Sequence, residues 1–125
     1  MFVNPASYRA FLGSGRWPDK TIFMLEVRHT GTDRLPNRAG LFQAEAVGLE
    51  AHVLDASKGG SRFYDFDGRS SSSPLSATST CNTCHAEHGA VDNTFVQFYP
   101  ELLTVAKAKG TLKPGFDLAQ AAPNH

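Results

Sequence analysis

Hydrophobic and polar residues alternate in the first half of the chain, which is the pattern of a half-buried β-strand. The clearest case is residues 21–28, where apolar and β-branched residues follow one another without Gly or Pro. Alternation places Phe23, Leu25 and Val27 on one face and Met24, Glu26 and Arg28 on the other. We expect the apolar set to face the interior, because burying Glu26 and Arg28 without good pairing would be costly.

Two further strands follow this one. Residues 41–55 alternate in their second half, with a helix as the competing prediction for Gln43–Ala46, and residues 62–66 form the third strand. Loops rich in Gly, Pro and Asn connect these segments, and the serine-rich residues 69–80 have the composition of a surface linker. This part of the chain therefore predicts an antiparallel meander.

Helices are expected at the two ends of the chain. The first runs from Asn4 to about Leu12, with Asn4 as its cap and Pro5 at its first position. Two more are predicted near the C-terminus: 94–99, capped by Asp92 or Asn93, and 100–109, closed by Gly110.

The composition is that of one small domain. The 125 residues are 41% hydrophobic, which is enough for a single core. We therefore expect one α+β domain, mainly β, over residues 1–125, with 110–125 as an extended tail. Twelve basic and twelve acidic residues give a net charge of zero without blocks of either sign, so no field favours binding to nucleic acid or an anionic membrane.

The chain has no run close to the ~20 apolar residues of a membrane-spanning helix. Its opening, MFVNPASYRAFLGSG, has neither a basic leader nor a continuous apolar segment. Because exported proteins lose their leaders, this does not exclude export. The compartment has to be inferred from the chemistry of the cysteines.

Both cysteines lie in one motif, Cys-Asn-Thr-Cys-His, at residues 81–85. Three chemistries use such a motif: a redox dithiol, a zinc site and covalent attachment of haem. A redox dithiol is expected after a strand in a βαβ unit, whereas a serine-rich stretch precedes Cys81. A zinc site would need Cys81, Cys84, His85 and His88 to converge, whereas structural zinc sites join two separated ligand pairs.

Haem attachment gives each of the three residues a role. The thiols of Cys81 and Cys84 bond the two vinyl groups of the porphyrin, and His85 is then placed to bind the iron from the proximal side. We therefore predict one haem c, attached through Cys81 and Cys84, with His85 as the iron ligand. Because haem is attached in this way outside the bacterial cytoplasm, we expect a periplasmic protein.

Three segments resemble a known family: WPDKTIFMLEVR, RFYDF and CNTCHAEHGAVDNTFVQFYPEL. They look like the cytochrome P-460 family, which includes cytochrome c′-beta, over roughly residues 4–103. The resemblance implies an antiparallel sheet of about five strands that carries the haem, helices around it, and a homodimer. Members named cytochrome P-460 oxidise hydroxylamine and have a lysine bonded to the porphyrin. Cytochrome c′-beta members lack that bond and bind nitric oxide or carbon monoxide under a phenylalanine cap.

The strands before the haem motif have no lysine where the family places one, and Leu25 and Leu54 occupy these positions. Lys20 and Lys58 lie nearby in predicted turns. The resemblance therefore favours a protein like cytochrome c′-beta, which binds nitric oxide or carbon monoxide at an open iron site. The alternatives are an enzyme that oxidises hydroxylamine and a low-spin electron carrier with a redox partner.

Several other residues are candidates for the haem pocket. Apolar candidates for contact with the haem are Phe23, Leu25, Phe42, Phe63 and Phe66. Met24 or His52 could supply a sixth iron ligand. Glu26 and Glu50 could accept protons from a nitrogenous substrate. His88 shares a helix face with His85 and could contact a haem propionate.

Overall fold

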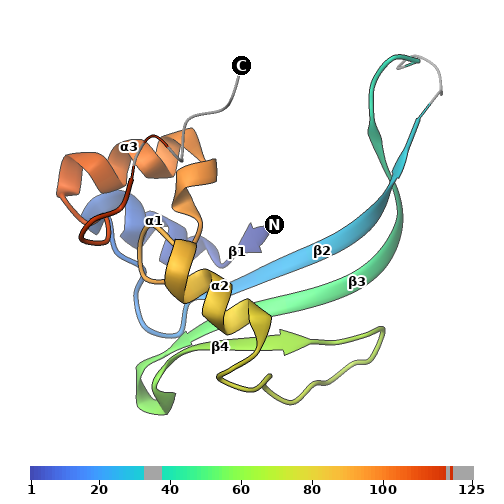
Figure 1. Cartoon of the computed structure of the whole chain (residues 1–125), viewed down its shortest axis with the longest axis horizontal. Coiled ribbons are helices and arrows are strands. Elements are labelled where there is room, and N and C mark those ends of the chain that lie inside the picture. Colours follow the sequence, from blue (N-terminus) through green and yellow to red (C-terminus); the bar gives the residue numbers. More distant parts are fainter. Residues whose placement is uncertain (33–37, 118, 120–125) are drawn as a thin grey trace.

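The computed structural model describes residues 1–32, 38–117 and 119, which form one sheet and three α-helices (Figure 1). The strands are β1 (Phe2–Val3), β2 (Ile22–Gly31), β3 (Phe42–Asp55) and β4 (Gly60–Asp65). The α-helices are α1 (Pro5–Ser14), α2 (Thr80–His88) and α3 (Pro100–Lys109), and short 3-10 helices lie at Ala56–Lys58 and Val96–Phe98. The predicted α+β class is confirmed.

The described strands form one antiparallel sheet in the order β1-β2-β3-β4, so the expected number of about five strands is wrong by one. A fifth segment does lie beside β4. The Leu75 N–H donates to the Phe63 carbonyl (2.7 Å), and Pro74 forms an isolated bridge with Tyr64. Pro74 has no N–H with which to continue the ladder, so this part of the serine-rich stretch does not become a strand.

Strands β2 and β3 form a long twisted hairpin that projects beyond the helices (Figure 1). Residues 43–46, for which a helix is the competing prediction, lie within β3. From Ile22 to Val27 the pairing with β3 is continuous, and the register shifts beyond Val27. The helices lie beside the inner half of the hairpin, which is where the site is built.

The register aligns residues in rows across the inner half of the sheet. One row, on β2, β3 and β4, consists of Phe23, His52 and Phe63. The next row on the same face consists of Leu25, Glu50 and Asp65. The row between them, with side chains on the opposite face, consists of Met24, Ala51 and Tyr64. Phe23 and Leu25 thus share the face that turns toward the helices.

The hydrophobic core lies between this face of the sheet and helices α1 and α3. Trp17 joins the two layers, because its ring contacts Phe11 of α1 (4.3 Å between centroids) and, edge to face, Phe23 of β2 (4.9 Å). The buried apolar cluster contains Phe11, Trp17, Phe23, Ala90, Val91, Val96, Leu102 and Ala106. Leu112 and Phe116, which belong to the predicted tail, pack against this cluster.

The start of α1 and the ends of α1 and α3 follow the predicted signals, except for the role of Asn4. Pro5 occupies the start of α1, and the helix ends at Gly15 in the left-handed conformation (φ 71°). Gly110 ends α3 in the same way (φ 63°). Asn4 does not donate or accept a capping hydrogen bond through its side chain. Its Oδ1 accepts from the Ile22 N–H (2.9 Å), so Asn4 links α1 to the sheet instead.

Asp55 provides a pH-dependent test of this fold. Its carboxylate accepts hydrogen bonds from Lys20 and from Ser57. The bond from Lys20 has the larger effect, and the two together lower the pKa of Asp55 from 3.8 to about 2. The resulting stabilisation is present above about pH 4 and is lost as the pH falls toward about 2. We expect Asp55→Asn to lower the urea midpoint at pH 7 and to match the wild type at about pH 2. Asp67→Asn, at another exposed turn, is the control, and an equal loss at both pH values would contradict the assignment.

Candidate functional site

Helix α2 carries the Cys-Asn-Thr-Cys-His motif along its length. The helix begins after Ser79, whose Oγ accepts a hydrogen bond from the Asn82 N–H (3.4 Å). The two cysteines do not form a disulfide with each other. Cys81 is partly buried and lines a cavity between α2 and the sheet, whereas Cys84 is exposed and does not line it. The structure therefore brings Cys81 and His85 to the same cavity wall.

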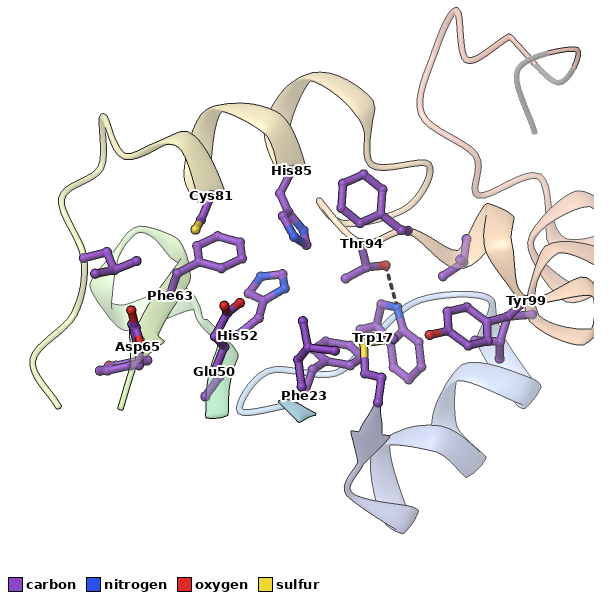
Figure 2. A pocket seen from close by; sticks show the side chains of 18 residues that line it. Trp17, Phe23, Glu50, His52, Phe63, Asp65, Cys81, His85, Thr94 and Tyr99 are labelled. Atoms are coloured by element: carbon purple, nitrogen blue, oxygen red, sulfur yellow. Dashed lines mark hydrogen bonds between the residues drawn. The ribbon is translucent and has the colours of Figure 1, made fainter. Parts of the chain in front are cut away.

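His85 points from α2 toward the sheet, as Figure 2 shows. Its Nδ1 lies 2.8 Å from the carbonyl oxygen of Asn93. A carbonyl can only accept, so Nδ1 carries the hydrogen and Nε2 holds the lone pair in the neutral ring. Burial lowers the pKa of His85, while the Asn93 carbonyl and Glu50 act in the opposite direction. The ring is thus held in the form in which imidazole binds a metal.

The Asn93 carbonyl is delivered by a tight turn over residues 91–94, which we call the Asp92–Asn93 turn. Asp92 and Asn93 both have positive φ (48° and 56°), and Val91 and Thr94 form an antiparallel bridge around them. This is the geometry of a two-residue hairpin turn, for which Asp and Asn are well suited. The prediction that Asp92 or Asn93 caps a helix is therefore wrong. The short helix Val96–Phe98 has no side-chain cap.

Three aromatic rings surround the imidazole of His85. The distances between ring centroids are 4.3 Å to Phe95, 4.6 Å to Phe63 and 5.1 Å to His52. Phe95 is not among the predicted site residues. Its position after the turn, inside the sequence that carries the family resemblance, is the signal that could have indicated it. These rings restrict the orientation of His85 in addition to the hydrogen bond from its Nδ1.

His52 is buried in the sheet wall of the cavity, with 7% of its surface exposed. Its ring stacks on Phe63 (4.1 Å between centroids, 18° between planes), and its Nε2 lies 2.9 Å from Ser61 Oγ. Burial, and to a smaller extent the electrostatic interaction with nearby His85, lowers the pKa of His52 to about 3. His52 is therefore a neutral side chain at pH 7, and its Nε2 is already engaged by Ser61.

The cavity has a volume of about 240 Å³ and mainly apolar walls. Most of its residues come from the sheet, from α2 and from residues 94–99 (Figure 2): Phe23, Leu25, Glu50, Ala51, His52, Phe63, Tyr64, Asp65, Cys81, His85, Thr94, Phe95, Val96 and Tyr99. The others are Met1, Trp17, Leu75 and Leu102 of α3. Of the predicted residues, Phe23, Leu25, Phe63, Glu50 and His52 line it together with Cys81 and His85.

Other predicted residues lie elsewhere. Met24 is on the opposite face of the sheet, and Glu26 accepts a hydrogen bond from Arg28 there. Phe42 is at the outer end of β3, and Phe66 follows β4 without lining the cavity. The side chain of His88 is 55% exposed, beside Glu87. Neither Met24 nor Glu26 reaches the cavity in this register.

The side chains of the cavity wall agree better with haem binding than with a zinc site. Within the part of the chain that the structure describes, no three His, Cys, Asp or Glu side chains form a group that could hold a metal ion, so the zinc interpretation finds no ligand set. No described lysine lines the cavity, and Leu54 packs against the core. The cavity wall carries the thiol of Cys81, the imidazoles of His52 and His85, and the carboxylates of Glu50 and Asp65.

Comparison with known proteins identifies the family. A family model described as cytochrome P460 matches residues 1–96, which include the sheet, α2 and the Asp92–Asn93 turn. The chain belongs to the cytochrome P460 family. Membership implies a haem cofactor and makes this chain a c-type haem protein of that family. No match to a curated protein was found.

The residues of the site fit a haem. The apolar walls suit a porphyrin ring, the Nε2 of the neutral His85 could bind its iron, and Cys81 on the same wall could supply a thiol for a bond to the ring. Among residues 1–32, 38–117 and 119, no helix is long and apolar enough to cross a membrane.

Gly89 provides a test of the contact between His85 and Asn93. A Cβ at this position would lie 2.6 Å from the His85 carbonyl oxygen and 2.7 Å from the Asn93 carbonyl carbon. We expect Gly89→Ala to push these two backbones apart and to lower the free energy of unfolding by ~1–3 kcal/mol. Urea denaturation measures the loss. Gly13→Ala is the matched control, because no heavy atom lies within 4 Å of its added Cβ, and a similar loss there would contradict the steric argument.

Proposed function

We propose that this protein is a mono-haem cytochrome whose haem is bonded through Cys81 and Cys84, with His85 on the iron, and that it binds nitric oxide or carbon monoxide. The observation that carries the proposal is the neutral imidazole of His85, held through Nδ1 by the Asn93 carbonyl with its Nε2 free inside an apolar cavity. When bound, the haem supplies an iron with a coordination position open to a diatomic gas.

The protein's own residues shape this site. The hydrogen bond between His85 Nδ1 and the Asn93 carbonyl orients the imidazole, and the rings of Phe63 and Phe95 pack against it. Phe23, Leu25 and Phe63 form an apolar wall on the sheet, which disfavours water and admits a small uncharged ligand. The ligand selectivity is therefore set mainly by the shape and polarity of this wall.

The absence of a lysine from the described cavity wall supports gas binding over the oxidation of hydroxylamine. Lys20 pairs with Asp55 at an exposed turn, and Leu54 occupies a position where the family resemblance places a lysine. One observation keeps the enzyme as the second candidate: Glu50 lines the cavity, where a carboxylate could accept a proton from a nitrogenous substrate.

The electron-carrier alternative has less support. It requires a sixth ligand from Met24 or His52 and a redox partner. Met24 lies on the opposite face of the sheet, and the Nε2 of His52 is hydrogen-bonded to Ser61. Either side chain would have to leave its present contacts to reach an iron held by His85.

We place the protein in the periplasm, because this type of haem attachment takes place outside the bacterial cytoplasm. We also propose a homodimer. The hairpin of β2 and β3 extends away from the helices and exposes Val47 and Leu49 on β3 and Leu41 just before it (Figure 1). Apolar side chains on a projecting hairpin are suited to contact with a second copy of the chain.

Covalent attachment is tested by replacing both cysteines. In the wild type, we expect haem to stay with the polypeptide after extraction with acidified acetone, and mass spectrometry to find it on the peptide that contains Cys81 and Cys84. The double variant Cys81→Ser/Cys84→Ser should lose all haem to the solvent phase. Each single variant should keep one bond. Loss of haem from the unmodified protein would contradict the attachment.

Gas binding is tested by absorption spectra of the ferrous protein with and without carbon monoxide. We expect a high-spin ferrous spectrum that changes on adding the gas, and a several-fold faster association in Phe23→Ala, because this change opens the apolar wall. Met24→Ala is the control on the same strand and should leave the spectrum unchanged. A low-spin spectrum indifferent to carbon monoxide would favour the electron carrier. A red-shifted ferrous band with a haem peptide that contains lysine would favour the enzyme.

A further inference from the structure

The Asp92–Asn93 turn is held by two residues that precede it by about 75 positions. The Asp92 carboxylate accepts a hydrogen bond from the Trp17 backbone N–H (3.1 Å) and one from the Arg16 guanidinium (2.6 Å). The Trp17 indole Nε1–H donates to Thr94 Oγ1 (3.0 Å). Three hydrogen bonds therefore connect residues 16–17 to the turn that carries the Asn93 carbonyl.

These contacts differ in how firmly they hold the turn. The side chain of Arg16 is 56% exposed, so its ion pair with Asp92 alone contributes little. Trp17, in contrast, is 8% exposed and packs between Phe11 of α1 and Phe23 of the sheet. Its backbone N–H is therefore a fixed donor. Through it, the carboxylate of Asp92 ties the turn to the centre of the core.

The Asp92–Asn93 turn also fixes the position of the Asn93 carbonyl, which accepts the hydrogen bond from His85. Asp92 and Asn93 are consecutive residues with positive φ, a conformation that is costly for residues other than glycine. The Asn93 carbonyl lies 2.8 Å from His85 Nδ1, and its direction depends on the backbone angles of both residues. A small relaxation at Asp92 would therefore lengthen or misalign the hydrogen bond to His85.

We propose that Asp92 is a positioning residue for His85: anchored by Trp17 and Arg16, it holds the Asn93 carbonyl against Nδ1 and so sets how strongly the imidazole binds iron. The inference rests on the proposed role of His85 as the iron ligand. A well-aligned carbonyl increases the basicity of a ligating histidine, as hydrogen-bonding partners of metal ligands generally do.

A simpler explanation is that Asp92 merely permits a positive φ. The two explanations predict opposite results for Asp92→Gly. Glycine adopts a positive φ more easily than aspartate, so the turn would be retained or improved. Glycine has no carboxylate, however, so the anchoring by Trp17 and Arg16 is lost. Asp92→Asn is intermediate, because its amide oxygen can still accept from the Trp17 N–H.

The experiment uses the ferrous haem protein and resonance Raman spectroscopy, which records the iron–histidine stretching band. We expect this band to shift to lower frequency in Asp92→Gly and by a smaller amount in Asp92→Asn, and the reduction potential to rise in the same order. Asp67→Gly is the matched control, since Asp67 also has a positive φ (44°), and its hydrogen bond to Asp65 comes from the backbone N–H, which glycine retains. Asp55→Asn controls for a general loss of stability.

An unshifted band in both Asp92 variants would overturn the proposal, as would an equal shift in Asp67→Gly or Asp55→Asn. If Asp92→Gly does not fold, Asp92→Asn decides the question, because its uncharged amide loses the ion pair with Arg16 and accepts a weaker hydrogen bond from the Trp17 N–H than the carboxylate does. Arg16→Gln removes the ion pair alone and should shift the band less. A wild-type protein without an iron–histidine band would overturn the proposed function and this inference together. A wild-type band that the Asp92 variants leave unmoved overturns the inference alone.

Discussion

The hydrogen bond from His85 Nδ1–H to the Asn93 carbonyl is the interaction on which the site depends. It fixes the tautomer of the ring, directs Nε2 into the cavity, and joins α2 to the turn that follows it. Gly89 makes the close approach possible, because a side chain there would collide with both backbones. The chain thus sets the orientation of its candidate iron ligand through backbone atoms, which no substitution of the Asn93 side chain removes directly.

The sheet supplies the opposite wall through its register. Phe23, His52 and Phe63 are aligned across three strands, so a slip of one residue in either pairing would replace an aromatic or imidazole ring by a residue from the other face. Trp17 then connects this wall to α1 and to the Asp92–Asn93 turn. The wall and the ligand therefore have a common support, and their relative position does not depend on α2 alone.

Much of this arrangement can be predicted from local patterns. Alternation along β2 places Phe23 and Met24 on opposite faces. The spacing of Cys81, Cys84 and His85, together with the polar lead-in and the many aromatic residues, favours haem over a dithiol or a zinc site. Interactions between distant segments cannot be predicted in this way. Nothing near Asp92 in the sequence indicates that its partners are Arg16 and Trp17. Asp and Asn are favoured both at helix caps and in turns with positive φ, so the residue types alone do not distinguish the two structures. The burial of His52 likewise depends on its neighbours in β2 and β4.

Helix α2 has only nine residues and none of them is fully buried. A helix of this length is not stable by itself in water, where about 12–15 residues are the usual minimum. Its order must come from the hydrogen bonds at its ends, from the contacts of His85 with Asn93 and the surrounding rings, and from a group bound in the cavity beneath it. A haem bound there would therefore complete the folding of α2, and the bonds proposed for its cysteines would fix their final geometry.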